Sequence, residues 1–301
     1  MKKLLVASIY SSVSTNNGWY DIQRKFFDLT TEDYDFGVFC NRVDPKYFPG
    51  AIILGEHTSK SLKEHFDNED YQPDDEDLSY SERRYCYDIR VAYFKIMDYF
   101  REHADEYENF LLIDCDAFPV CPDWQNVLNS KLKTWKKWYA TLLRSENFES
   151  YPWLGLMYIQ NEYIHEDIPD WFPRKYENTW GDKFREFGTT RIKTHHEGEC
   201  IWYPLVRSNV LNLHPIRFGI YNHLFYHHMK GSWDKSDRQL NLDPEVTVNS
   251  IPEMYGYYDH YIPRKNHALI AEHCHERLIR DPENFICQLM GVDSSWFKGK
   301  I

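Results

Sequence analysis

The sequence predicts an α/β protein in which a central, mostly parallel twisted sheet is flanked by helices. Residues 4–9 form a nearly continuous apolar run, as in a parallel strand that is buried on both faces. A helical pattern over residues 81–101 leads into a second apolar run at 110–113, and a helix that feeds a buried strand is typical of an α/β sheet. Because the 301 residues contain no clear linker, we expect one continuous domain.

Periodicity and composition predict the remaining elements. The helix over 81–101 opens with Ser79 and Glu82 at capping-box spacing and then repeats apolar residues at helical intervals. Residues 67–77 carry seven carboxylates, so a solvated loop is expected there. Further strands are expected at 36–40, 51–54 and near 201–206, and further helices at 19–28, 123–132, 178–187 and 265–280.

Composition excludes several classes of partner. The formal net charge is -12, which repels phosphate backbones and anionic lipid, so no nucleic-acid partner is expected. No run approaches the roughly 18 apolar residues of a membrane span. The seven cysteines include no CxxC pair, which indicates no disulfide framework and predicts a reducing, cytoplasmic location. Aromatic residues reach 17%, so we expect some of them to line a binding cleft.

Two carboxylates, Asp114 and Asp116, directly follow the apolar run at 110–113. Open α/β sheets bind ligands at the carboxyl ends of their strands, and alternate residues of a strand point to the same side. Two carboxylates held close together repel each other, and a divalent cation relieves that repulsion; hard oxygen ligands suit Mg²⁺ or Mn²⁺. The alternative is a turn in which both aspartates cap the following backbone.

The segment FLLIDCDAFP at 110–119 resembles metal-dependent glycosyltransferases of the GT-A fold, in which an apolar strand ends in a DxD motif. The resemblance covers about the first 125 residues. In that superfamily the DxD motif holds a divalent ion that bridges the diphosphate of a nucleotide-sugar. The resemblance therefore implies Mn²⁺ or Mg²⁺ and a UDP- or GDP-sugar donor. Because a strand would place both carboxylates on one face, we expect Asp116 as a direct metal ligand and Asp114 in contact with the ribose or a metal-bound water.

A second segment, YHHMKGSW at 226–233, is similar to the element that completes the metal site in many GT-A enzymes. In those enzymes a late histidine is followed by small residues and a basic residue that reaches the donor phosphates. The resemblance implies His228 as the third ligand, with His227 as the alternative, and Lys230, Gly231 and Ser232 at the phosphates. The usual His-x-x-Gly-x-x-Lys order is not reproduced, because Lys230 precedes the glycine. The competing interpretation is a pair of surface histidines.

The same resemblance implies a catalytic base between these two segments. Inverting GT-A enzymes carry a carboxylate that removes the proton of the acceptor hydroxyl as it attacks the anomeric carbon. Glu199 and Glu197 flank Gly198 just before the strand expected near 201–206, and Asp182 is a further candidate. The alternative interpretation of this stretch is an exposed acidic turn.

Five further residues are candidates for nucleotide binding by the same resemblance. Ser8, Ile9 and Tyr10 stand at the end of the first expected strand and would flank the base. Arg84 and Asp88 lie on the helix that leads toward the DxD motif and could face the nucleotide. Arg84 could equally be an ion-pair partner of the acidic loop.

Together these features predict a glycosyltransferase of glycan biosynthesis that transfers a hexosyl or related sugar to a glycan or other hydroxyl acceptor. Residues 1–125 would form the nucleotide-sugar-binding half, and residues 126–301 the acceptor-binding half that completes the metal site. Two alternatives stay open: a non-catalytic sugar-binding protein, and a metal-dependent phosphohydrolase that uses the same carboxylates.

Overall fold

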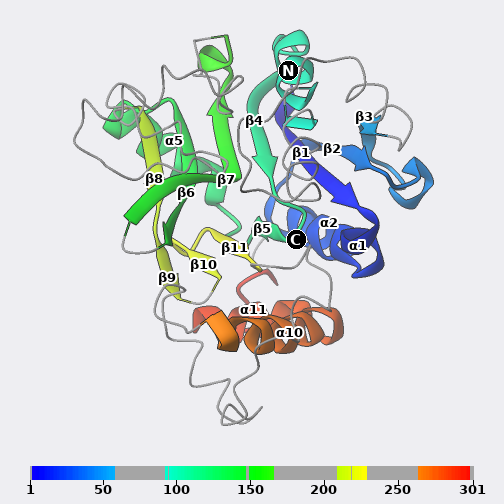
Figure 1. The fold of residues 1–301 in the computed structure, drawn as a ribbon. Helices are drawn as coiled ribbons and strands as arrows, with labels where there is room; N and C mark the ends of the chain where they lie inside the picture. Colours follow the sequence, from blue (N-terminus) through cyan, green and yellow to red (C-terminus); the bar gives the residue numbers. More distant parts are fainter. Residues whose placement is uncertain are drawn as a thin grey trace, which may run out of the picture.

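The computed structural model describes residues 2–57, 92–93, 95–146, 149–165, 209–217, 219–228 and 264–298. They form a seven-stranded sheet of order β3-β2-β1-β4-β7-β6-β8 and a four-stranded sheet of order β5-β11-β10-β9 (Figure 1). The strands of the large sheet are β1 (Lys2–Ser11), β2 (Tyr34–Asn41), β3 (Ile52–His57), β4 (Tyr107–Ile113), β6 (Tyr139–Glu146), β7 (Glu149–Gln160) and β8 (Val210–Leu213). The strands of the small sheet are β5 (Ala117–Pro119), β9 (Pro215–Arg217), β10 (Ile220–Tyr221) and β11 (Phe225–His227).

Helices surround both sheets. The described ones are α1 (Ser12–Asn16), α2 (Trp19–Thr30), α5 (Trp124–Trp135), α10 (Arg264–Arg280) and α11 (Pro282–Met290), with short 3₁₀ turns η1 (Pro45–Tyr47) and η2 (Asn161–Tyr163). Residues 92–93 and 95–102 are also helical. In the view of Figure 1, α10 and α11 lie below the small sheet. None of the helices within the described segments is long and apolar enough to cross a membrane.

The large sheet is mostly parallel, as predicted. β1 pairs in parallel with β2 and β4, β2 with β3, and β6 with β8, whereas β7 runs antiparallel to both of its neighbours. The chain leaves β1 toward β2 and β3 on one side and returns to β4 on the other side of β1. The strand order therefore reverses between β1 and β4, and α/β sheets place their ligand sites outside the carboxyl ends of the strands at such a point.

Most described elements agree with the sequence predictions. The expected strands at 4–9, 36–40, 51–54 and 110–113 and the helices at 19–28, 123–132 and 265–280 are confirmed, and residues 92–93 and 95–101 of the expected helix are helical. The strands β6 to β8 and the whole small sheet had not been predicted. The acidic loop at 67–77, the helix at 178–187 and the strand near 201–206 lie outside the described residues.

Strand alternation divides the core between the two faces of the large sheet. Leu4, Val6 and Tyr10 of β1 face a cluster built with α2, α5, α10 and α11. Leu5 and Ala7 face the opposite way, into a cluster with Ile96 and Phe100 of the helical stretch 95–102. The strand is thus buried on both sides, which explains the nearly continuous apolar run at 4–9.

Many of the aromatic side chains are buried in this core. Phe26 of α2 stacks on Phe118 of β5 with ring centroids 4.2 Å apart, and both rings are fully buried. The Trp124 indole donates a 3.0 Å hydrogen bond to the hydroxyl of Thr31, which satisfies its polar edge inside the core. Burial of each such ring stabilises the fold by about 2–3 kcal/mol. These contacts hold the small sheet against α2.

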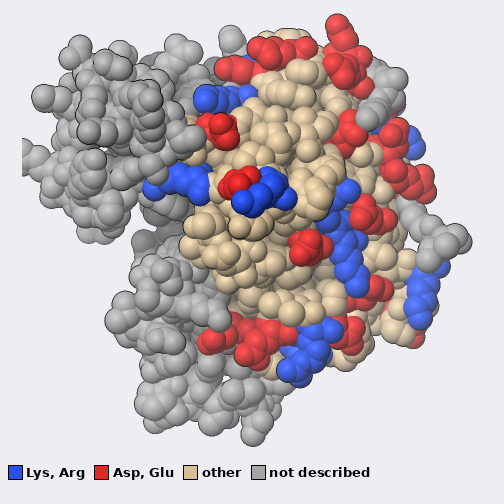
Figure 2. All heavy atoms as spheres, turned by 90° about the vertical axis from the view of Figure 1, so that its right-hand side faces the viewer, with Lys and Arg blue, Asp and Glu red and all other residues tan. Residues whose placement is uncertain are grey.

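The described part of the face drawn in Figure 2 carries charges of both signs. Figure 2 shows acidic and basic side chains interspersed on the face it presents. Among the described residues on that face there is no continuous basic surface of the kind that a phosphate backbone requires.

Candidate metal centre

The candidate site begins where the carboxyl ends of β1 and β4 meet. The Ser8 hydroxyl of β1 donates a 2.7 Å hydrogen bond to the carbonyl of Ile113, the last residue of β4. Ser8 is fully buried, so this bond is shielded from water and ties the two strand ends together. The backbone that follows β4 is therefore held next to the end of β1.

Asp114 and Asp116 lie on a tight turn that links β4 to β5. The Ala117 amide donates to the Asp114 carbonyl at 3.0 Å, and the Asp114 amide donates to the Gly155 carbonyl of β7 at the same distance. The prediction that a shared strand face aligns the two carboxylates is therefore wrong, because β4 ends at Ile113. The turn of the alternative interpretation is present, and it directs both carboxylates toward a third group.

That third group is the imidazole of His227, at the end of β11. β11 pairs with β5 so that His227 stands opposite Ala117, and the His227 amide donates to Gly219 at 2.8 Å. Its Nε2 atom lies 3.5 Å from Asp114 Oδ2 and 3.5 Å from Asp116 Oδ1. One ligand atom from each of these residues lies within 4.8 Å of the other two. Two atoms bound to one Mg²⁺ or Mn²⁺ are at most about 4–5 Å apart, so the three groups fit a single ion.

His228, which the sequence favoured as the ligand, points away from the carboxylates. Its ring lies 4.6 Å from the ring of Trp19, and its Nδ1 atom is 2.9 Å from the Tyr226 hydroxyl. Successive side chains of an extended segment point to opposite faces, so only one of two adjacent histidines can reach the site. That one is His227, and His228 is fully buried in the core beside it.

Burial and neighbouring charges together set the protonation state of His227. Burial alone would lower its pKa, but the Asp116 carboxylate, hydrogen bonds to both aspartates and the charge of Asp114 raise the pKa to about 9. Asp116 and His227 are each 3% exposed, whereas the side chain of Asp114 is 30% exposed. In the metal-free protein the protonated imidazole compensates the two carboxylates, the same role that a divalent cation would fill.

Cys115, between the two aspartates, is not a candidate thiolate ligand. Burial raises its pKa well above the ordinary value, and the Asp116 and Asp114 carboxylates raise it further. The thiol therefore stays neutral, and thiolate is the form that binds metals. The available donors are two carboxylates and one imidazole, a set that suits Mg²⁺ or Mn²⁺ better than a structural zinc ion.

Gln23 of α2 supports the turn and was missed by the sequence predictions. Its Nε2 atom donates to the carbonyls of Asp114 and Ala117 at 2.8 and 2.5 Å, and its Oε1 atom accepts from the Tyr10 hydroxyl at 2.6 Å. The side chain is fully buried. The sequence signal for Gln23 is its place on the apolar face of α2. Trp19 lies four residues before it and Phe26 three residues after it, so all three share one helix face.

We expect Gln23→Leu to loosen the metal centre from a distance. The substitution keeps the volume but leaves two carbonyls and the Tyr10 hydroxyl without this partner, which costs about 2–4 kcal/mol of unfolding free energy. Loss of such a supporting contact lowers metal affinity by about 10 to 100-fold. Calorimetric Mn²⁺ titration and thermal unfolding of Gln23→Leu measure both effects, and unchanged Mn²⁺ affinity would contradict the role of Gln23.

The remaining candidates divide into buried and undescribed residues. Ser8 and Tyr10 have fully buried side chains, so in this conformation they support the site from within the core and do not present side chains to a ligand. Ile9 is half-buried and faces the other way. The other predicted site residues lie outside the described residues: Arg84, Asp88, Asp182, Glu197, Glu199, Lys230, Gly231 and Ser232.

The chain resembles several solved glycosyltransferase structures at low sequence identity. One is the glycosyltransferase GlyE of Streptococcus pneumoniae TIGR4, with 10% identity and a TM-score of 0.40 over 71% of this chain and 45% of that chain. Another is a glycosyltransferase involved in glycosylation of the major capsid of PBCV-1. It has 13% identity and a TM-score of 0.31, and the match covers 75% of this chain and 94% of that chain. A third is galactosyltransferase LgtC in complex with donor and acceptor sugar analogs. It has 9% identity and a TM-score of 0.38, and the match covers 69% of this chain and 73% of that chain.

The chain thus spans less than half the length of the GlyE structure. No protein-family model matches it, and no curated protein sequence matches it either.

Proposed function

We propose that the protein is a metal-dependent glycosyltransferase that moves a sugar from a nucleotide-sugar to a hydroxyl acceptor. The observation that carries the proposal is the cluster of Asp114, Asp116 and His227 outside the carboxyl ends of β1 and β4, where the strand order reverses. Three protein ligands leave open positions on an ion that takes six, and diphosphate oxygens are suitable occupants. When bound, Mg²⁺ or Mn²⁺ would supply Lewis-acid stabilisation of the departing diphosphate.

The two halves of the chain would have different tasks. Asp114 and Asp116 come from the half at 1–125, which we propose binds the nucleotide-sugar, and His227 comes from the half at 126–301, which we propose binds the acceptor. Lys230 follows His227 by three residues in the sequence, and we propose that its amine pairs with the phosphates of the donor. We propose that Gly231 and Ser232 contribute amide donors there, and that Arg84 and Asp88 face the nucleotide.

The acceptor would be activated by a carboxylate if the reaction inverts the anomeric configuration. We propose Glu199 for this base, with Glu197 and Asp182 as alternatives, because a carboxylate near the acceptor hydroxyl takes its proton as the new bond forms. If the configuration is retained, no such base is needed, and the departing diphosphate is the proton acceptor. We also propose a reducing, cytoplasmic location, because the seven cysteines of the sequence include no CxxC pair.

A donor screen tests the proposed function. UDP- and GDP-sugars are incubated with the protein and mixed glycan acceptors, with Mn²⁺, Mg²⁺ or EDTA, and release of nucleoside diphosphate is measured. We expect release that depends on metal and acceptor. Equal binding of nucleoside diphosphates in EDTA and in Mn²⁺ would contradict the proposal. Phosphate release from simple esters would favour the phosphohydrolase, and glycan binding without metal or turnover would favour the sugar-binding protein.

Metal binding is expected to release a proton. Because the folded-state pKa of His227 is about 9, above the ordinary 6.5, the imidazole is protonated at pH 7, and a metal ligand must be neutral. We expect release of about one proton per ion at pH 7 and an affinity for Mn²⁺ that rises with pH up to about 9. Calorimetric titrations in buffers of different ionisation enthalpy count the protons. An affinity that is the same at pH 6 and pH 8.5 would be inconsistent with His227 as a ligand.

The same pKa shift predicts how the metal-free protein responds to pH. Folding raises the pKa of His227 from 6.5 to about 9. The imidazole therefore stabilises the fold fully below pH 6.5, and this stabilisation is lost as the pH rises through about 9.

A further inference from the structure

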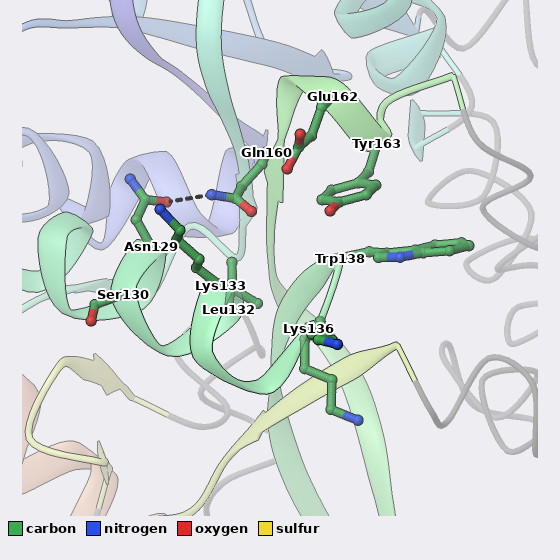
Figure 3. A pocket seen from close by; sticks show the side chains of 10 residues that line it. Asn129, Ser130, Leu132, Lys133, Lys136, Trp138, Gln160, Glu162 and Tyr163 are labelled. Atoms are coloured by element: carbon green, nitrogen blue, oxygen red, sulfur yellow. Dashed lines mark hydrogen bonds between the residues drawn. The ribbon is translucent and has the colours of Figure 1, made fainter.

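A second concave site lies near the ends of the large sheet's strands away from the metal centre, where β4 begins and β7 ends. The cavity has a volume of about 820 Å³. Its lining comes from α5, the segment between α5 and β6, the end of β7 and η2: Asn129, Ser130, Leu132, Lys133, Lys136, Lys137, Trp138, Gln160, Glu162 and Tyr163 (Figure 3). A volume of this size accommodates a ligand of several rings.

The register of the sheet shows that the two sites are separate. Gln160, in the lining, pairs with Asn109 at the start of β4, whereas Asp114 follows the end of β4. Five residues of extended strand span about 16 Å. None of the lining residues belongs to the metal cluster.

Aromatic and amide groups face this cavity together. The rings of Trp138 and Tyr163 are nearly parallel, at 11°, with centroids 5.6 Å apart, and Figure 3 shows one above the other beside Gln160 and Glu162. The Gln160 amide donates a 3.2 Å hydrogen bond to Asn129, which holds both side chains at the wall. Flat apolar rings beside fixed amides and a carboxylate match the two kinds of surface on a sugar, its C–H face and its hydroxyl groups.

The charge of the lining is opposite to that of the chain as a whole. Lys133, Lys136 and Lys137 line the cavity, against one carboxylate, Glu162, in a chain whose net charge is -12. Basic side chains gathered in one concavity raise the local concentration of anions. The lining therefore favours a ligand that carries negative groups.

Lys136 occupies a backbone position where glycine is normally preferred. It caps the carboxyl end of α5 with a left-handed φ of 51°, its amide donates to Lys133, and the Lys137 amide donates to Leu132 at 2.9 Å. A residue with a Cβ atom is strained in this helix-ending conformation, which glycine adopts freely. The strained position therefore carries a side chain that lines the cavity.

We propose that this cavity binds an acidic oligosaccharide, independently of the metal centre. Trp138 and Tyr163 would pack against sugar rings, Gln160 and Glu162 would bind hydroxyl groups, and the three lysines would pair with carboxylate or sulfate groups. A surface that combines lysine and tryptophan side chains can also bind an anionic membrane. The structure disfavours it, because Trp138 is half-buried in a concave wall while the exposed Trp135, at 66%, does not line the cavity.

The test uses glycan binding measured without metal or nucleotide. Fluorescence or calorimetric titrations use oligogalacturonate, chondroitin sulfate and heparin oligosaccharides, with neutral galactan oligosaccharides for comparison. We expect an acidic oligosaccharide to bind in EDTA as well as in Mn²⁺. Trp138→Ala should weaken this binding by about tenfold or more, as truncation of a central aromatic anchor does. The matched control Trp135→Ala should leave the affinity within about twofold, since Trp135 is outside the lining.

Lys136→Gly separates binding from folding. This variant should melt at a higher temperature, because glycine relieves the left-handed strain, and yet bind the acidic oligosaccharide several-fold more weakly. Lys131→Gln removes a lysine of the same segment that does not line the cavity, and it should bind as the parent does.

Three results would overturn the proposal. The first is that none of the acidic oligosaccharides binds. The second is unchanged affinity in both Trp138→Ala and Lys136→Gly. The third is binding to phosphatidylglycerol vesicles that Trp135→Ala abolishes and Trp138→Ala does not, which would make this face a membrane-docking surface. Because the readout is made without metal, donor or turnover, failure of this proposal is distinct from failure of the proposed transferase activity.

Discussion

Asp116→Ala is expected to abolish metal-dependent nucleotide binding and to lower sugar transfer by at least about 10³-fold. Asp116 is 3% exposed and lies 3.5 Å from His227 Nε2, so its carboxylate is held beside the imidazole that we propose as its fellow ligand. Calorimetry with Mn²⁺ and a nucleoside diphosphate measures the loss. The exposed Asp105, changed to alanine, is the control and should bind both ligands as the parent does.

The stability of the metal-free Asp116→Ala variant provides a second readout. Repulsion between two carboxylates alone would predict that removing one of them stabilises the fold. In the structure, however, a protonated His227 lies 3.5 Å from each carboxylate and would lose one of the two negative charges that compensate it. We therefore expect the unfolding free energy at pH 7 to fall by about 2–3 kcal/mol. A higher melting temperature than the parent would show that His227 is neutral in the metal-free site.

The adjacent histidines are expected to have opposite phenotypes. His227→Ala should lower Mn²⁺ affinity by at least about 100-fold, because it removes the nitrogen ligand. His228→Ala should keep Mn²⁺ affinity within about tenfold but lower the unfolding free energy by about 2–4 kcal/mol. The cause is a cavity beside Trp19 and the loss of the 2.9 Å contact with Tyr226.

One outcome with this pair of variants would contradict the assignment of His227 as the ligand. If His228→Ala loses Mn²⁺ affinity at a temperature where circular dichroism shows it folded, while His227→Ala keeps it, the ligand assignment is reversed. Measuring both variants at the same temperature, well below either melting point, separates ligation from stability.

The sequence predicted the part of the fold that rests on long, regular patterns. The apolar run at 4–9 and the helix at 19–28 were evident because burial on one or two faces imposes a period on several consecutive residues. The small sheet was not evident, since β5, β10 and β11 are two or three residues long and too short to show alternation. β7 was hidden because a long strand that contains Pro152 and an irregularity between Trp153 and Met157 does not alternate cleanly.

The candidate site was predicted in composition but not in geometry. Asp114 and Asp116 were recognised because they follow a buried apolar strand, where α/β sheets place their ligands, and because the segment resembles a DxD motif. The choice between His227 and His228 depends on which face of β11 meets the turn, and that register is set by pairing with β5, which no local pattern reveals. The support from Gln23 depends on two carbonyls more than 90 residues away along the chain.

The most direct test of the metal centre is a crystal structure of the protein with Mn²⁺ and a nucleoside diphosphate, with the ion located by its anomalous scattering. We predict one strong peak within about 2.0–2.4 Å of an Asp116 carboxylate oxygen and of His227 Nε2, with diphosphate oxygens completing its coordination. A peak bound by His228 in place of His227, or a nucleoside diphosphate bound away from the carboxyl ends of β1 and β4, would contradict the assignment.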